Sequence, residues 1–338
     1  MLARNDYRIF KALFDFNIET LEPAVMWKEL ADYRPSNQES RVFNRRIRDR
    51  IVDLAVLLEK SADETEFQSH MAAFYGEYGV GKFGLNKAFR IIEKEDEHQF
   101  IIDPIINVEH VYFKDIVGYE AQKKKLIENT EAFISGKEAN NVLLFGDAGT
   151  GKSSSIKGIL NQYYDEGLRI IEVYKHQFVD LNQVIAQIKD RNYKFIIYMD
   201  DLSFEEFEIE YKFLKAVIEG GVETKPENIL IYATSNRRHL IKETWNDRSD
   251  VENSNGMHRS DTMEEKLSLV NRFGVTINYS KPSQKEYFEI VFELARKAGI
   301  KMGEDELKLE ANKWELSHGG ISGRTAQQFI NHLMGLQA

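Results

Sequence analysis

The chain has 338 residues, of which 55 are acidic and 45 are basic, so its net charge is −10. This length allows two or three domains with cores of their own, and the acidic balance argues against a general nucleic-acid coat. The sequence contains no cysteine, which excludes disulfides, thiolate zinc sites and cysteine nucleophiles. No apolar run is long enough to span a bilayer, and the first residues are too charged for a signal peptide. We therefore expect a cytoplasmic protein with no membrane partner.

Residues 1–105 are predicted to form a mainly helical N-terminal domain. Three candidate helices cover residues 6–21, 39–60 and 64–75. Five arginines lie within residues 41–50, where on a helix they would surround one apolar stripe. We interpret them as a solvated face with intramolecular partners. Contact with a phosphate backbone or an acidic protein is the alternative.

A glycine cluster follows the last of these helices. Residues 76–83 read G-E-Y-G-V-G-K-F, which fits the phosphate-binding pattern G-x-x-x-x-G-K. Phe83 stands where that pattern needs a magnesium-binding hydroxyl, and the preceding residues are typical of a helix instead of a buried strand. We therefore predict a helix-breaking turn and assign Lys82 no phosphate-binding role.

A complete phosphate-binding pattern occurs in the middle of the chain. Residues 142–153 read V-L-L-F-G-D-A-G-T-G-K-S, an apolar strand that runs into G-x-x-x-x-G-K-S. Its glycines let the backbone curl until N–H groups face an anion, and the following helix directs its positive end to the same charge. Lys152 is placed to reach the β- and γ-phosphates, and the Ser153 hydroxyl to bind Mg²⁺. The residues expected to hold the nucleoside triphosphate are Gly146, Asp147, Ala148, Gly149, Thr150, Gly151, Lys152, Ser153 and Ser154.

Residues 106–281 alternate apolar strands with helices, which predicts an α/β domain with a parallel five-stranded sheet covered on both faces. Each strand is a nearly continuous apolar run, as burial on both sides requires. The five strands are 142–145, 168–173, 195–199, 229–233 and 275–279. The helices between them are 152–164, 179–190 and 207–219. Residues 282–338 are predicted to form a lid of three helices, the first opened by a capping box from Ser283 to Glu286.

The third of these strands ends in two carboxylates, Asp200 and Asp201. The carboxyl end of such a strand faces the same crevice as the phosphate loop. Asp200 therefore suits Mg²⁺, through a bound water, and Asp201 is placed to orient or deprotonate the attacking water. A helix N-cap beside a surface charge is the structural alternative.

From about Phe113 to its C-terminus the chain resembles the AAA+ ATPases. Residues 113–120, F-K-D-I-V-G-Y-E, are similar to the segment that packs near the adenine in that family. Residues 231–236, I-Y-A-T-S-N, resemble the sensor-1 strand. This resemblance implies that Asn236 lies near the γ-phosphate and the lytic water.

The same resemblance implies roles for two arginines. Residues 269–274, L-V-N-R-F-G, resemble the arginine-finger segment, so Arg272 is expected to reach the γ-phosphate of a neighbouring subunit. Residues 322–324, S-G-R, resemble the sensor-2 motif of the lid, which implies that Arg324 contacts the nucleotide of its own subunit. The alternatives are an ion pair of Arg272 with an acid such as Glu265 and an exposed Arg324. Other candidates for the role in trans are Arg237, Arg238, Arg248 and Arg259.

Two features depart from the AAA+ pattern. The family's acidic pair is usually Asp-Glu, whereas this chain has Asp200-Asp201, whose second carboxylate is one methylene shorter. A polar stretch at residues 244–263 also enlarges the region between sensor 1 and the finger. More narrowly, the chain is similar to an uncharacterised bacterial AAA+ group known as a domain of unknown function, through Y-G-x-G-K-F, D-D-L-S-F-E and A-T-S-N-R-R-H-L.

The expected function is that of an ATPase that couples binding and hydrolysis of Mg-ATP to conformational change in a homo-oligomer. The alternative is a nucleotide-gated binding or loader module for a DNA-handling or protein partner, with little turnover. A nucleotide kinase or other phosphotransferase is less favoured, because it leaves the order of the sensor motifs and the helical lid unexplained. The sequence shows no aromatic-hydrophobic-Gly pore loop of the unfoldase kind.

Overall fold

The computed structural model describes residues 2–17, 45–79, 81–94, 99–204, 210–219, 226–236, 240 and 269–336. The chain divides into two compact units, residues 1–87 with 104–108 and residues 88–103 with 109–338. None of the helices in the described residues has both the length and the apolarity needed to cross a membrane.

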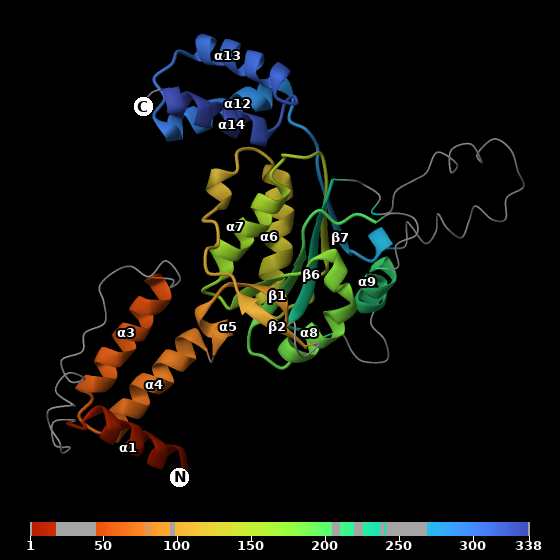
Figure 1. Cartoon of the computed structure of the whole chain (residues 1–338). Helices are drawn as coiled ribbons and strands as arrows, with labels where there is room; N and C mark the ends of the chain where they lie inside the picture. Colours follow the sequence, from red (N-terminus) through yellow and green to blue (C-terminus); the bar gives the residue numbers. More distant parts are fainter. Residues whose placement is uncertain are drawn as a thin grey trace, which may run out of the picture. The chain divides into compact units, whose positions relative to one another are not determined.

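The first unit is helical. Its helices are α1 (Leu2–Phe14), α3 (Arg45–Lys60), α4 (Glu64–Tyr78) and α5 (Lys82–Leu85). Helices α1, α3 and α4 contact one another (Figure 1). Phe67 of α4 is buried against the rings of Tyr7 and Phe14 from α1. Helix α4 begins where the Asp63 side chain accepts hydrogen bonds from the backbone N–H groups of its first turn.

The glycine cluster that follows α4 is a turn between two helices. Helix α4 continues through Gly76 to Tyr78 and α5 begins at Lys82, so no strand precedes the pattern. Gly84 is buried, and a Cβ at this position would lie 2.1 Å from the carbonyl oxygen of Tyr78. The glycine directly after the cluster, Gly84, is therefore required by close backbone packing.

The second unit is built around a seven-stranded sheet in the order β2-β1-β4-β5-β6-β3-β7. Its strands are β1 (Ala88–Lys94), β2 (Gln99–Pro104), β3 (Val142–Gly146), β4 (Leu168–Glu172), β5 (Lys194–Met199), β6 (Ile229–Ser235) and β7 (Val275–Tyr279). Every pairing from β1 to β7 along this order is parallel. The predicted α/β fold is confirmed, and the five predicted strands form the contiguous run from β4 to β7.

The sheet contains two strands more than the five predicted. Strands β1 and β2 come from residues 88–104, which the sequence analysis placed in the helical N-terminal domain. In β1, Phe89 and Ile91 are buried while Ile92 is exposed, and in β2 Ile102 is buried while Ile101 is exposed. Such segments, in which buried and exposed positions are mixed, carry a weaker signal than the continuous apolar runs of the central strands.

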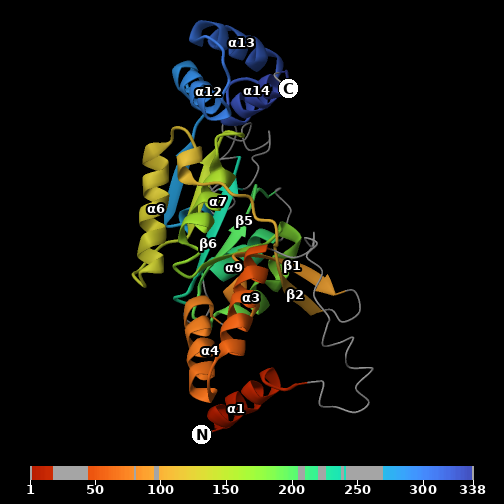
Figure 2. The same cartoon turned by 90° about the vertical axis from the view of Figure 1, so that its left-hand side faces the viewer.

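Helices cover both faces of the sheet. Helices α6 (Glu120–Ile134) and α7 (Lys152–Tyr163) lie on one side, and α8 (Leu181–Ile188) and α9 (Glu210–Glu219) on the other (Figures 1 and 2). The short 3₁₀ segments η2 (Phe113–Asp115) and η3 (Lys175–Asp180) precede α6 and α8. Because parallel strands all point the same way, the loops after β3, β5 and β6 emerge at one edge of the sheet.

Three helices follow β7, namely α12 (Gln284–Ala298), α13 (Glu304–Ser317) and α14 (Gly323–Leu336). They pack around their own core, in which Tyr287, Val291, Ala311 and Ala326 are fully buried. The predicted capping box opens α12: the Ser283 N–H donates to the Glu286 carboxylate at 2.7 Å, and the Glu286 N–H donates back to Ser283 Oγ at 3.3 Å.

Candidate functional site

The loop between β3 and α7 has the backbone that its glycines predict. Gly146, Gly149 and Gly151 have φ angles of 129°, 75° and 92°, a region that residues with a Cβ rarely adopt. At Gly146 a Cβ would also lie 2.2 Å from the carbonyl oxygen of Tyr279 on the neighbouring strand β7. The loop therefore turns sharply against the sheet, and α7 begins at its end with unpaired N–H groups.

Two side chains of the loop bond back into the protein. Thr150 Oγ1 donates to the Asp147 carbonyl at 2.8 Å, and Asp147 Oδ2 accepts from the Lys281 N–H at 2.8 Å. The Asp147 N–H donates to the Tyr279 carbonyl at 3.0 Å. Asp147, included in the predicted phosphate-binding set, thus uses its carboxylate to fasten the loop to the chain after β7.

Lys152 is more enclosed than the sequence alone suggests, with 6% of its surface exposed. Its Nζ donates to the carbonyls of Gly146 and Asp147 at 2.9 and 2.6 Å and to Asn236 Oδ1 at 3.0 Å. Burial lowers the pKa of Lys152, and nearby carboxylates, first Asp147 and then Asp201, oppose that shift. The ammonium is thus held inside the curl of the loop by three oxygen acceptors.

Asp200 accepts three hydroxyl hydrogen bonds on a single oxygen. The donors to its Oδ1 are Ser153 Oγ at 2.8 Å, Tyr198 OH at 2.6 Å and Thr234 Oγ1 at 2.6 Å. Burial by itself would raise the pKa of Asp200, but the hydrogen bonds from Thr234, Tyr198 and Ser153 outweigh it and lower the pKa below its ordinary value. Asp200 is therefore an ionised carboxylate in contact with the serine of the phosphate loop.

Asp201 and Asn236 form the next layer of the site. Asp201 has a left-handed backbone, with φ at 49°, and its N–H donates to Thr234 Oγ1 at 2.9 Å. Asn236 Nδ2 donates to Asp201 Oδ1 at 2.7 Å, while its Oδ1 accepts from Lys152. The structure thus brings together Lys152, Ser153, Asp200, Asp201 and Asn236, five of the residues that the sequence analysis selected.

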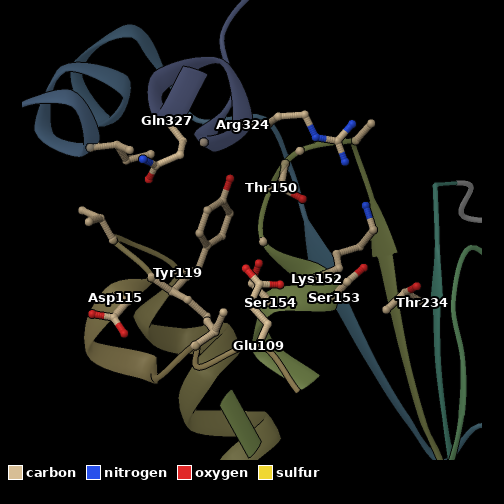
Figure 3. A pocket seen from close by; sticks show the side chains of 18 of the residues that line it. Glu109, Asp115, Tyr119, Thr150, Lys152, Ser153, Ser154, Thr234, Arg324 and Gln327 are labelled. Atoms are coloured by element: carbon tan, nitrogen blue, oxygen red, sulfur yellow. The ribbon is translucent and has the colours of Figure 1, made fainter. Parts of the chain in front are cut away.

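These residues line one end of a cavity of about 650 Å³. The predicted loop residues from Ala148 to Ser154 also line it, whereas Gly146 and Asp147 do not. Sticks in Figure 3 show Lys152, Ser153 and Thr234 on one side of this cavity. The apolar residues that line the cavity are Val111, Ile116, Val117, Ile290 and Leu294, and Tyr119, Glu109, Asp115 and Gln327 line it as well.

The sequence analysis missed several of these lining residues. Ile290, Leu294 and Gln327 belong to the lid helices α12 and α14, and only their place in the fold brings them to the cavity. Thr234 could have been found from the sequence, because it lies two residues before the predicted site residue Asn236. In the same way, Tyr198 lies two residues before Asp200. Side chains two apart on a strand share a face.

Arg324 reaches the same cavity from the start of α14. Its N–H donates to the Gly149 carbonyl at 3.2 Å, so the lid contacts the phosphate loop through the backbone. Figure 3 shows the Arg324 side chain beside the loop that carries Thr150. A Cβ on Gly149 would lie 3.0 Å from Ser322 Oγ and 3.1 Å from the Cβ of Arg324.

Gly149→Ala should therefore weaken both the fold and nucleotide binding. The left-handed backbone alone costs about 1–2 kcal/mol of unfolding free energy, and the added methyl pushes the lid from the loop. Gly319→Ala is the matched control, since Gly319 has a φ of 88° and no atom within 4 Å of its Cβ position. Denaturant unfolding should show a lower free energy of unfolding in both variants. Nucleotide titration should show a weaker nucleotide affinity only in Gly149→Ala. Equal nucleotide affinities in the two variants would contradict this contact.

Arg272 does not line the cavity. It lies in the turn before β7 and forms an ion pair with Glu219, the last residue of α9, while 35% of its side chain stays exposed. The alternative partner Glu265 and the competing Arg237, Arg238, Arg248 and Arg259 lie outside the described residues, as do residues 244–263. An ion pair is thus observed for Arg272, but with a different acid from the one considered.

The oxygen donors beside the loop suit Mg²⁺. Within the described residues no cluster of three or more His, Cys, Asp or Glu side chains is arranged to hold a metal. Mg²⁺ at phosphate sites commonly uses one or two protein oxygens, with waters and phosphate oxygens completing its shell. The Ser153 hydroxyl and the ionised Asp200 carboxylate, in contact at 2.8 Å beside the loop, fit that requirement.

Comparisons with known proteins give a family. Residues 84–337 match the model of a family described as "Protein of unknown function (DUF815)". No curated protein matches the chain significantly. Among solved structures, a RuvB mutant from Thermotoga maritima is 15% identical with a TM-score of 0.45, and the match covers 68% of each chain. The AAA domain of FIGL-1 in complex with ADP is 18% identical with a TM-score of 0.45, over 68% of this chain and 74% of that one. The chain therefore belongs to the DUF815 family.

Proposed function

We propose that this protein binds Mg-ATP at the loop between β3 and α7 and hydrolyses it as part of a homo-oligomer. The observation that carries this proposal is the contact between Ser153 and Asp200 within a cavity that also holds Lys152, Asp201 and Asn236. A phosphate loop, a metal carboxylate and a water-facing acid are the parts that phosphoryl transfer to water requires. Nucleotide binding alone would not need the second acid.

Each residue has a role that follows from its position. Lys152 and the loop N–H groups hold the β- and γ-phosphates, and Ser153 with Asp200 holds Mg²⁺, which neutralises charge on the phosphates when bound. Asp201 orients the attacking water, with Asn236 fixing its carboxylate. Arg324 contacts the nucleotide from the lid, so that ATP and ADP favour different positions of the lid.

The second candidate is a nucleotide-gated binding module with little turnover, acting on a DNA-handling or protein partner. One observation favours it: the short Asp201 carboxylate is held by Asn236, which also holds Lys152. Fixed there, a carboxylate one methylene shorter than that of glutamate stands further from the attacking water, and a displacement of about 1 Å is enough to lower a rate severely. The two candidates share the binding site and differ in the fate of ATP.

The rate of phosphate release, measured over a range of protein concentrations with and without DNA, separates these candidates. An ATPase completed between subunits gives a specific activity that rises with concentration as the oligomer forms. A binding module gives stoichiometric ATP binding with no more than trace phosphate release at every concentration. Stimulation by DNA would identify the class of partner in either case.

Replacing the two acids one at a time should separate metal binding from hydrolysis. Asp200→Ala should weaken Mg²⁺-dependent ATP binding, because it removes the carboxylate that contacts Ser153. Asp201→Asn should keep ATP binding and lower the hydrolysis rate by about 10²–10⁴-fold, the usual contribution of a positioned acid or base. Asparagine tolerates the left-handed backbone of Asp201, so the fold should be retained.

Isothermal titration for ATP and steady-state phosphate release check both variants. Hydrolysis by Asp201→Asn at the wild-type rate would move the water-orienting role to another acid. Glu205 and Glu206, which lie outside the described residues, would be tested next.

A further inference from the structure

Three hydroxyls donate hydrogen bonds to Asp200, and the phosphate-binding motif accounts for only one of them. Ser153 belongs to the loop, but Tyr198 and Thr234 come from the sheet itself. Tyr198 lies two residues before Asp200 on β5, and Thr234 lies on the adjacent strand β6. The parallel register pairs Tyr198 with Tyr232 and Met199 with Ala233, so that Thr234 is level with Asp200 one step further.

Both side chains are enclosed, with 7% of Tyr198 and 1% of Thr234 exposed. A buried hydroxyl needs a partner, and here the carboxylate is that partner. Hydrogen bonds to an ionised acceptor are short and stronger than neutral ones, and the observed 2.6 Å for each agrees with this class. The two donors therefore hold the Asp200 carboxylate in one orientation before any ligand arrives.

Thr234 links the two acids of the site. Its hydroxyl has a single proton, which it gives to Asp200, and its oxygen accepts the Asp201 N–H at 2.9 Å. The left-handed backbone at Asp201 is thus fixed by the same side chain that fixes the carboxylate of Asp200. Loss of the Thr234 hydroxyl would release both restraints together.

We propose that Tyr198 and Thr234 are positioning residues for the metal: their hydroxyls hold Asp200 in the orientation that Mg²⁺ and Ser153 require. This inference rests on the proposed function, since it concerns how tightly the ATP site holds its metal. The physical reason is preorganisation. A carboxylate already fixed by neighbours loses less conformational freedom when it becomes part of a metal shell.

The test uses the full chain with Tyr198→Phe and Thr234→Val, each of which removes a hydroxyl at nearly constant volume. Mg²⁺ is titrated at fixed ATP to find the concentration that gives half-maximal Mg²⁺-dependent ATP binding, and ATP binding is measured separately in EDTA. Each variant should need about 10–100-fold more Mg²⁺, the typical effect of removing a partner of a metal ligand. ATP affinity in EDTA should not change, and Thr234→Ser should restore the wild-type requirement.

Tyr232→Phe is the matched control. Tyr232 is a fully buried tyrosine paired with Tyr198 in the sheet, but its hydroxyl contacts Asn129 and Thr130 instead of an acid of the site. Tyr232→Phe should lower the thermal stability of the protein without changing the Mg²⁺ concentration needed for half-maximal ATP binding. The inference would be overturned if Tyr232→Phe raised the Mg²⁺ requirement as much as the other two variants do. It would also be overturned if Tyr198→Phe and Thr234→Val left that requirement unchanged. Wild-type protein that binds ATP without any dependence on Mg²⁺ would instead overturn the proposed function.

Discussion

Arg272→Ala should keep ATP binding and lower ATP hydrolysis by about 10³–10⁵-fold, the contribution of an arginine that stabilises charge on the γ-phosphoryl oxygens from a neighbouring subunit. The expected size follows from the proposed role in trans, because Arg272 lies outside the cavity of its own chain. The measurement is the ATPase rate of the variant and of its mixture with Lys152→Ala. In mixed oligomers an intact pocket meets an intact arginine, so partial activity should return.

The ion pair with Glu219 provides a control for this prediction. Glu219→Gln breaks the same pair but leaves the guanidinium in place. If Arg272 serves only to join α9 to the segment before β7, both variants should lose similar stability and similar activity. If it acts on a neighbour, Glu219→Gln should retain hydrolysis at the wild-type rate or above it, since the guanidinium no longer has to leave a carboxylate. Full activity of Arg272→Ala as a dilute monomer would contradict the role in trans.

Lys152→Ala should weaken ATP binding by roughly 10–150-fold, which corresponds to about 1.5–3 kcal/mol for a charge-assisted contact. The enclosed position of Lys152 adds a structural consequence. Its removal leaves the Gly146 and Asp147 carbonyls without the donor that they share. A measurable change in thermal stability of the nucleotide-free protein is therefore expected in addition to the loss of affinity.

Lys82→Ala is the control for Lys152→Ala. Lys82 follows the other G-x-x-x-x-G pattern, is exposed, and begins the short helix α5. Its replacement should leave the dissociation constant for ATP unaltered in the same titration. Unchanged affinity in Lys152→Ala would contradict the assignment of the phosphate loop, and a comparable loss in Lys82→Ala would show that the first glycine cluster also takes part.

Local pattern predicted the centre of the α/β unit well. Strands β4, β5 and β6 are almost entirely buried, so their sequences are nearly continuous apolar runs with little competing interpretation. The phosphate loop and the capping box at Ser283 are likewise local, because a few consecutive residues fix their own backbone.

The edge of the sheet formed by β2 and β1 could not be predicted from local sequence pattern in the same way. Strands β1 and β2 contain charged residues and expose apolar ones, Ile92 and Ile101, so neither is a continuous apolar run. The pairing of β1 with β4 depends on residues about eighty positions away in the sequence, and no local period encodes such a contact.

The sequence by itself determined the phosphate loop, the paired acids at a strand end and the positions of the core strands, because each is written in consecutive residues. Only the tertiary structure decided how these parts meet. The three hydroxyls on Asp200, the amide of Asn236 between Lys152 and Asp201, and the pairing of Arg272 with Glu219 all join different elements. Such contacts depend on strand register and helix packing, which are set by the whole fold and not by the neighbours of any one residue.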